Sequence, residues 1–334
     1  MRHRLALAAL FLAASASAAQ QPPPPPPDSP PLRVDVQLVN VDVSVTDAAG
    51  NFFSHLAAAN FRILEDGVPQ MVAHFAPTQA PVRLALLVEV SPAVFLIRYD
   101  HLAAADILLA GLRPEDEAAL LTYARALRPE VGFTRDKAAV ERRLHNLGRF
   151  GLGAADVRLL DAVAQTLDQL GAPPQRTAVL VIGTGLDSGN QAAWEELERR
   201  VGASQVTFFA VATGRLLRAD PEDNRRDTGE TQADAAFAAA DARLRALAAA
   251  SAGEAYFPQS ADELEKIYRQ IAERLRHLYS LGYYPTNRAR DGAYRQITVE
   301  LVEENGAPLR LRDAKGNLVR PRLFARPGYF AATE

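Results

Sequence analysis

Cysteine is absent from the 334 residues of this sequence. Disulfide bridges, thiolate metal sites and lipid-bearing cysteines are therefore excluded, because each of them needs the thiol. Histidine is also scarce, and the six histidines lack the paired spacing of a zinc-binding helix or zinc finger. After the N-terminal stretch, no apolar run reaches the length of a transmembrane helix, so the sequence predicts no membrane span.

An excess of basic residues is missing as well, since 37 Lys and Arg residues face 40 Asp and Glu residues for a net charge of -3. Nucleic-acid binders gather positive charge against the phosphates, so nucleic acid is not a predicted partner. The composition, with 48% hydrophobic and 23% charged residues, is that of an ordinary globular protein. The length allows one substantial core and a smaller second unit.

The N-terminus has the pattern of a secretory signal. A basic start at residues 2–4 precedes an apolar stretch at residues 5–14 and a run of small residues that ends at Ala19. This order is typical of a cleaved signal peptide, so we expect residues 1–19 to be removed and the protein to be exported, either periplasmic or secreted.

A proline-rich segment, residues 20–31, follows the predicted signal peptide. Its unbroken proline run from Pro22 to Pro27 fixes φ and removes backbone donors. We expect this segment to extend as a polyproline II spacer, with a docking ligand for a proline-binding partner as the alternative.

Both ends of the remaining chain have the alternating pattern of β-strands. Within the N-terminal β segment, residues 32–78, Val41, Val43 and Val45 alternate with polar residues, and Asp66-Gly67 between apolar runs predicts a hairpin. The alternation returns in the C-terminal β segment, residues 283–334. We predict that these two segments pair with each other in a small β-sandwich or sheet.

Between residues 79 and 282, short apolar strands alternate with amphipathic helices. Strands that are apolar on both faces, each followed by a helix, predict an α/β domain with a doubly wound, mostly parallel sheet. Such sheets bind ligands outside the carboxyl ends of the strands, at the switch point of the strand order. The predicted strands are 83–90, 117–123, 177–182, 206–212 and 254–257, and the predicted helices are 98–111, 135–147, 157–170, 191–201, 233–250 and 261–281.

The segment Leu86–Ala93, at the end of the first core strand, carries a specific resemblance. Together with Val43–Asp47, Asn60–Gly67, Leu281–Pro285 and Arg326–Phe330, it is similar to von Willebrand factor A-related (VWFA) proteins of the exported bacterial kind common in Acidobacteria. The resemblance covers nearly everything after the proline run. It implies a von Willebrand A-like fold for residues 79–282.

The resemblance implies that this sequence be compared with the metal-ion-dependent adhesion site of that family. The first-strand motif Asp-x-Ser-x-Ser, a later threonine and a later aspartate hold a magnesium-like ion, which takes a further acidic ligand from a partner. In this sequence Glu89 replaces the aspartate, Ser91 is kept, and Ala93 replaces the second serine.

The remaining positions of the motif also differ. The threonine position falls at Val157 and the last aspartate position at Gly183 or Thr184. Hard cations are bound through several oxygen ligands, and alanine, valine and glycine side chains supply none. The sequence therefore predicts a degenerate site and no required cofactor, with weak magnesium or manganese binding left open. The candidate metal ligands are Glu89, Ser91, Thr184 and Asp187.

Two other chemistries are not predicted. The glycine-rich stretch Gly183–Gly189 lacks both the lysine of a phosphate loop and the spacing of a dinucleotide fingerprint. Neither Ser91 nor Ser188 has the surrounding residues of a hydrolase triad, so no catalytic residue is predicted.

We therefore expect an exported, non-enzymatic adhesion or scaffolding module that binds a protein partner through the carboxyl edge of its sheet, largely without metal. Metal-dependent binding of a partner's carboxylate through Glu89 and Ser91 is the first alternative, and a hydrolase is the second. The polar stretch Arg218–Asp234 is either a disordered loop or a partner-specific lip at this edge. The stretch Pro92–Phe95 either presents apolar surface to a partner or packs under the next helix.

Overall fold

A computed structural model describes residues 38–78, 80–147, 156–173, 175–189, 192–217, 232–313 and 315–333. The predicted signal peptide, the proline-rich spacer and residues 218–231 of the predicted lip lie outside these ranges. Among the described helices, none combines the length and the apolar character that crossing a membrane requires.

A six-stranded sheet forms the centre of the α/β part, in the order β10-β9-β8-β5-β6-β7. All neighbours in this sheet are parallel except β6 and β7. Numbered along this sheet, the strand order is 3-2-1-4-5-6, which is that of a doubly wound fold, so the predicted fold class is confirmed. The strands are β5 (Arg83–Glu89), β6 (Glu117–Tyr123), β7 (Leu127–Thr134), β8 (Thr177–Gly183), β9 (Val206–Ala212) and β10 (Glu254–Tyr256).

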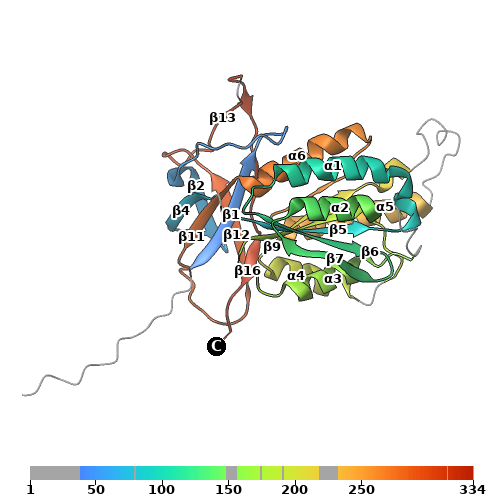
Figure 1. Cartoon of the computed structure of the whole chain (residues 1–334). Helices are drawn as coiled ribbons and strands as arrows, with labels where there is room; N and C mark the ends of the chain where they lie inside the picture. The colour runs from blue at the N-terminus through green and yellow to red at the C-terminus, as the bar shows by residue number, and fades with distance from the viewer. Residues whose placement is uncertain are drawn as a thin grey trace, which may run out of the picture. The chain divides into compact units, whose positions relative to one another are not determined.

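Helices cover both faces of this sheet because its strands are apolar on both sides. Along β5, Leu84 and Leu86 pack with α1, α2 and α6, whereas Ala85 and Leu87 pack with α3, α4 and α5. In the view of Figure 1, α1 and α6 lie above the sheet and α3 and α4 below it. The helices are α1 (Arg98–Gly111), α2 (Lys137–Leu147), α3 (Leu159–Leu170), α4 (Trp194–Ala203), α5 (Gln232–Ala250) and α6 (Asp262–Arg276), with 3-10 turns at Ala58–Asn60, Pro92–Ile97 and Gly214–Leu217.

The N- and C-terminal β segments pair with each other, as predicted. One sheet has the order β15-β1-β11-β4, a second has the order β16-β12-β2-β3, and β13 pairs with β14. Residues of both ends share one apolar cluster, which includes Val43, Ile63, Tyr279 and Ile297. The strands are β1 (Val39–Thr46), β2 (Phe61–Glu65), β3 (Val68–Gln70), β4 (Val72–Thr78), β11 (Leu278–Tyr283), β12 (Tyr294–Leu301), β13 (Leu311–Arg312), β14 (Leu318–Val319), β15 (Arg322–Phe324) and β16 (Gly328–Phe330).

The terminal motifs that carry the family resemblance meet at one buried carboxylate. Tyr283 and Tyr329 donate hydrogen bonds from their hydroxyls to Oε2 of Glu65, at 2.7 and 3.0 Å. Glu65 is 2% exposed. Because hydrogen bonds to a buried charge are strong, this cluster fixes β2, β11 and β16 against one another. We call these three residues the Glu65 cluster.

The structure differs from the sequence-based elements in three places. The helix predicted to end at residue 281 ends at Arg276, and Leu278–Tyr283 is a strand of the terminal sheet. Strand β7 was not predicted; it is the antiparallel edge strand beside β6. The Asp66-Gly67 hairpin is confirmed between β2 and β3, but the apolar run that follows Met71 pairs with β11 in the other sheet.

Candidate functional site

The site lies where β5 and β8 are neighbours at the middle of the sheet. Glu89 is the last residue of β5, and Thr184 follows the last residue of β8. From these two strands the chain winds outward in opposite directions, toward β7 on one side and β10 on the other. This is the switch point of the doubly wound sheet, where ligand crevices form at the carboxyl edge.

Three of the four predicted site residues come together at this point. Ser91 donates its hydroxyl to Oε1 of Glu89 at 2.5 Å. Thr184 donates both its backbone N–H and its hydroxyl to Oε2 of Glu89, at 2.6 and 2.8 Å. All three residues are at most 3% exposed. The Glu89 carboxylate is therefore satisfied by the chain itself, with donors on both oxygens.

Among the described residues, no basic side chain forms an ion pair with the buried Glu89 carboxylate. Burial raises the pKa of Glu89, and the hydrogen bonds from Ser91 and Thr184 offset part of that rise. The Tyr123 hydroxyl faces the same carboxylate and has no well-aligned hydrogen bond among the described residues. Burial and the nearby carboxylates of Glu89 and Asp187 raise the pKa of Tyr123 well above its ordinary value, so it stays neutral.

Gly183 provides the space that the Glu89 side chain occupies. A Cβ atom at Gly183 would lie 2.4 Å from Oε2 of Glu89 and 2.7 Å from the Tyr123 hydroxyl. Both separations are shorter than van der Waals contact, so a side chain at position 183 and the observed position of Glu89 exclude each other. An aspartate at position 183 would meet the same obstacle.

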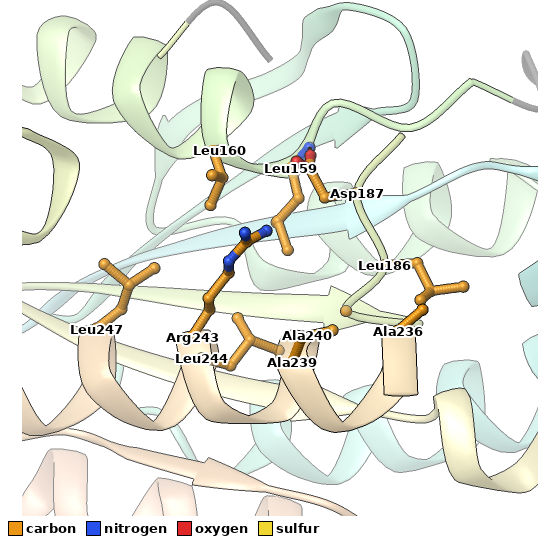
Figure 2. Close-up of a pocket in the computed structure, with 11 residues that line it drawn as sticks. Leu159, Leu160, Leu186, Asp187, Ala236, Ala239, Ala240, Arg243, Leu244 and Leu247 are labelled. Atoms are coloured by element: carbon orange, nitrogen blue, oxygen red, sulfur yellow. Dashed lines mark hydrogen bonds between the residues drawn. The ribbon is translucent and has the colours of Figure 1, made fainter. Parts of the chain in front are cut away.

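The fourth predicted residue, Asp187, is turned to the start of α3. Its Oδ1 accepts the backbone N–H of Leu159 at 2.7 Å, and Figure 2 shows the two residues in contact. Burial raises the pKa of Asp187, whereas hydrogen bonds from the N–H groups of Leu159 and Leu160 act in the opposite direction. A carboxylate at a helix N-terminus is stabilised by the helix dipole, so Asp187 caps α3.

The neighbouring positions that could replace a lost ligand are also engaged elsewhere. Asp156 lies 3.4 and 3.5 Å from the guanidinium groups of Arg125 and Arg158. Val157 is buried, and its backbone exchanges hydrogen bonds with Ser188. Ser188 thus holds two loops together.

The arranged side chains do not fit a magnesium-type ion as they stand. Such ions require several oxygen ligands in a defined geometry. One carboxylate and two hydroxyls meet here, and the hydroxyls of Ser91 and Thr184 both donate to Glu89. To coordinate an ion, Glu89 would have to move from its hydrogen-bonded position.

A hollow of about 160 Å³ lies next to this edge, between the start of α3, the loop after β8 and one face of α5. Figure 2 shows Arg243 rising from α5 toward the Leu159 and Leu160 side of the hollow. The space exists because α5 presents small residues there, Ala236, Ala239 and Ala240. Sequence reasoning missed this hollow; its only signal was the alanine-rich character of the helix. The other lining residues are Gly185, Leu186, Asp187, Leu244 and Leu247.

A group of potential metal ligands that the sequence did not suggest lies away from the edge. Asp106 on α1 and Glu141 and His145 on α2 place one ligand atom each within 4.8 Å of one another. Nε2 of His145 is 2.9 Å from the Asp106 carboxylate, and both residues of α2 are exposed. In this geometry the group is a solvent-exposed hydrogen-bonded contact between two helices. The spacing of four residues between Glu141 and His145 was its only sequence signal.

No protein-family model matches the sequence, and no curated protein is significantly similar to it. Solved structures with similarity include a von Willebrand factor type A protein from Catenulispora acidiphila, at 10% identity and a TM-score of 0.45, covering 90% of this chain and 76% of that one. The von Willebrand domain of the type V pili tip protein Mfa5 from Porphyromonas gingivalis has 9% identity and a TM-score of 0.44, covering 59% and 95%. BatB from Bacteroides thetaiotaomicron has 16% identity and a TM-score of 0.39, covering 58% and 98%.

Proposed function

We propose that this chain is an exported, non-enzymatic adhesion or scaffolding module that binds a protein partner through the carboxyl edge of its α/β sheet, largely without metal. The observation that supports it is the state of Glu89. The carboxylate at the switch point accepts three hydrogen bonds from Ser91 and Thr184. Glu89 is thus neither an open metal ligand nor a free base. The carboxyl edge can therefore bind a partner through its surface contacts.

The hydroxyl groups of the edge support a role without catalysis. The Ser91 hydroxyl donates its hydrogen bond to the Glu89 carboxylate. To act as a nucleophile, Ser91 would need a neighbouring general base that removes its proton. Ser188 is bonded to the Val157 backbone instead. A hydrolase is therefore a weaker proposal, tested by a substrate panel in which any turnover would have to vanish in Ser91→Ala.

Two features of the edge suit contact with a partner. Ala93 is exposed on the turn that follows β5. The hollow beside α3 is walled by leucines and carries Asp187 and Arg243, so it would accept an apolar side chain flanked by polar groups. Protein interfaces commonly combine a buried apolar anchor with a polar rim. The side chain of Phe95 and residues 218–231, both expected near this edge, lie outside the described part of the structure.

Export is proposed from the N-terminal sequence pattern alone. The basic start, apolar centre and small residues of positions 1–19 are those of a signal peptide. N-terminal sequencing of the protein recovered from the cell envelope or medium tests it, with a first residue near position 19 or 20 expected. An intact Met1 in the exported fraction would contradict it.

A second candidate, metal-dependent binding of a partner's carboxylate, is favoured by one observation. Glu89 is 3% exposed, and no basic side chain pairs with it among the described residues, so a positive charge beside its carboxylate would be stabilising. A magnesium or manganese ion could supply that charge if Glu89, Ser91 and Thr184 rearranged around it, with Asp187 released from α3.

Site-specific photocrosslinking separates these proposals. Ala93→p-benzoylphenylalanine places a crosslinker at the carboxyl edge, and Ala172→p-benzoylphenylalanine places the same group at an exposed position beyond the end of α3. Irradiation in the native envelope, followed by mass spectrometry, should give one protein adduct from position 93 that is absent from position 172.

The same experiment with chelator distinguishes the two modes of binding. An adduct that survives chelator supports the metal-independent edge, whereas its loss, reversed by added magnesium or manganese, supports the metal-dependent alternative. Equal adducts from both positions, or none from position 93, would contradict a partner at this edge.

A further inference from the structure

A second cavity, of about 20 Å³, lies far from the switch point, where the terminal β strands meet the α/β part. Ser44 of β1, Arg176 just before β8 and Arg274 of α6 contribute polar side chains to its wall. A volume of this size holds one particle of water size or slightly larger, since a water needs about 10–15 Å³. The cavity is therefore a site for a single small species.

Three hydrogen-bonding atoms of these residues are buried and lack a partner in the described part of the chain. They are Oγ of Ser44, Nη1 of Arg176 and Nε of Arg274. Ser44 is 3% exposed and Arg274 is 4% exposed. A buried donor without an acceptor is destabilising, and more so when the group is charged. The two arginine atoms can only donate, and the Ser44 hydroxyl can donate as well, so an acceptor in the cavity would satisfy all three.

Arg274 cannot turn its unpartnered N–H toward solvent. Its Nη1 is 3.1 Å from Glu254, and its Nη2 donates to the Ala252 carbonyl at 2.8 Å. Its guanidinium carbon also lies 3.7 Å from the centre of the Phe324 ring. Nη2 of Arg176 is directed to the Arg274 carbonyl at 3.4 Å, which keeps the two arginines together. The donor geometry of the cavity is thus fixed by its surroundings.

Positive charge exceeds negative charge around the cavity. Glu254 is shared between Arg274 and Arg322. Asp42, which also lines the cavity, interacts with both Arg176 and Arg326, and Asp116 adds to its effect on Arg176. Burial lowers the pKa of Arg176 and of Arg274, which means that the carboxylates present do not offset the loss of water. An added negative charge would be stabilising here.

We propose that this cavity binds one monatomic anion of chloride size, held by Ser44, Arg176 and Arg274 at the joint between the terminal β strands and the α/β part. A water molecule accepts two hydrogen bonds and must place two hydrogens of its own, whereas the two unpartnered arginine groups of the wall can only donate. A halide accepts from all three donors and supplies the missing charge. The anion would tie β1 to β8 and α6.

Thermal unfolding of the purified full chain tests this in sodium chloride, sodium bromide and sodium gluconate at equal ionic strength. Because a ligand of the folded state alone raises stability, we expect Tm to be about 2–5 °C higher in chloride and bromide than in gluconate. Equal ionic strength removes general screening of surface charge as the cause.

A pair of variants and a crystal locate the effect. Ser44→Ala should reduce the difference between chloride and gluconate, whereas Thr298→Ala, which removes an exposed hydroxyl from β12, should leave it unchanged. Crystals grown in bromide should show an anomalous peak within hydrogen-bonding distance of Arg274 Nε. The same Tm in chloride and gluconate, or a cavity that holds only water in the bromide crystal, would overturn the proposal, whether or not Ser44→Ala folds.

Discussion

Gly183→Ala is the sharpest test of how the switch point is built. The added methyl group would lie 2.4 Å from Oε2 and 2.6 Å from Cβ of Glu89, and 2.7 Å from the Tyr123 hydroxyl. These atoms belong to buried side chains in the middle of the sheet, so the clash cannot be relieved by moving into solvent. Either Glu89 gives up its hydrogen bonds to Thr184, or the two strands shift.

The expected cost follows from overpacking. Inserting a methyl group into a packed interior costs about 1–3 kcal/mol. For a protein of about 300 residues, 1 kcal/mol corresponds to about 1.5 °C in Tm, so Gly183→Ala should lower Tm by about 1.5–5 °C. Gly132→Ala is the matched control, because a Cβ at Gly132 of β7 has nothing within 4 Å. Its Tm should change little.

A double-mutant cycle assigns the clash to Glu89. Glu89→Gly removes both Oε2 and Cβ, which alanine at this position would not do. In that background Gly183→Ala should cost less than in the parent protein, by a coupling energy of about 0.5–3 kcal/mol in urea unfolding. If Gly183→Ala costs the same in both backgrounds, or costs no more than Gly132→Ala, the mutual exclusion of the two side chains is refuted.

Three further outcomes are expected. Burial raises the pKa of Glu89 above 4.5, so its contribution to stability is fully present at low pH and is lost as pH rises through the folded pKa. The Tm of Glu89→Gln minus that of the parent should therefore increase with pH above 4.5. A difference that does not change with pH would argue against this. Calorimetric titration with magnesium or manganese should show no tight, stoichiometric binding, and such binding would favour the metal-dependent alternative. Tyr283→Phe should lower the free energy of unfolding by about 1.5–3 kcal/mol through the loss of its bond to Glu65, whereas Tyr284→Phe, at an exposed neighbour, should have little effect; similar losses in both would contradict the role of the Glu65 cluster.

The doubly wound sheet could be predicted because its signals are local. Strands such as Glu117–Tyr123 and Val206–Ala212 are mostly apolar, and their predicted bounds agree with the structure. Strand β7 was missed because Pro129 and Gly132 interrupt its pattern and its pairing with β6 is irregular. The residues of β11 were assigned to a helix because they continue the apolar period of α6. Tyr279, Leu281 and Tyr283 alternate as in a strand, but this strand forms only by pairing with β1 and β4, which are distant in sequence.

At the site, the convergence of Glu89, Ser91 and Thr184 could be anticipated from the order of the strands. The direction of each hydrogen bond could not, because it depends on the space above Gly183 and on the length of the glutamate side chain. The position of Asp187 was also beyond the sequence. Asp187 follows Thr184 by three residues, so its carboxylate could have been expected beside Glu89. The backbone N–H of Leu159, at the start of α3, binds it instead.

The pairing of β4 with β11 has a consequence for how this chain is assembled. Thr78 at the end of β4 is the register partner of Leu278 at the start of β11, so the entire α/β part is a loop of about 200 residues inserted between two adjacent strands. Adjacent strands are about 4.8 Å apart, so the two ends of this insert must be held that close together. An α/β part that folds first would bring those ends together and remove most of the entropy cost of closing such a loop. The α/β part is thus an insertion that could be exchanged as a unit. A short turn in its place would leave a β4–β11 hairpin, and another domain with equally close ends could occupy the same position.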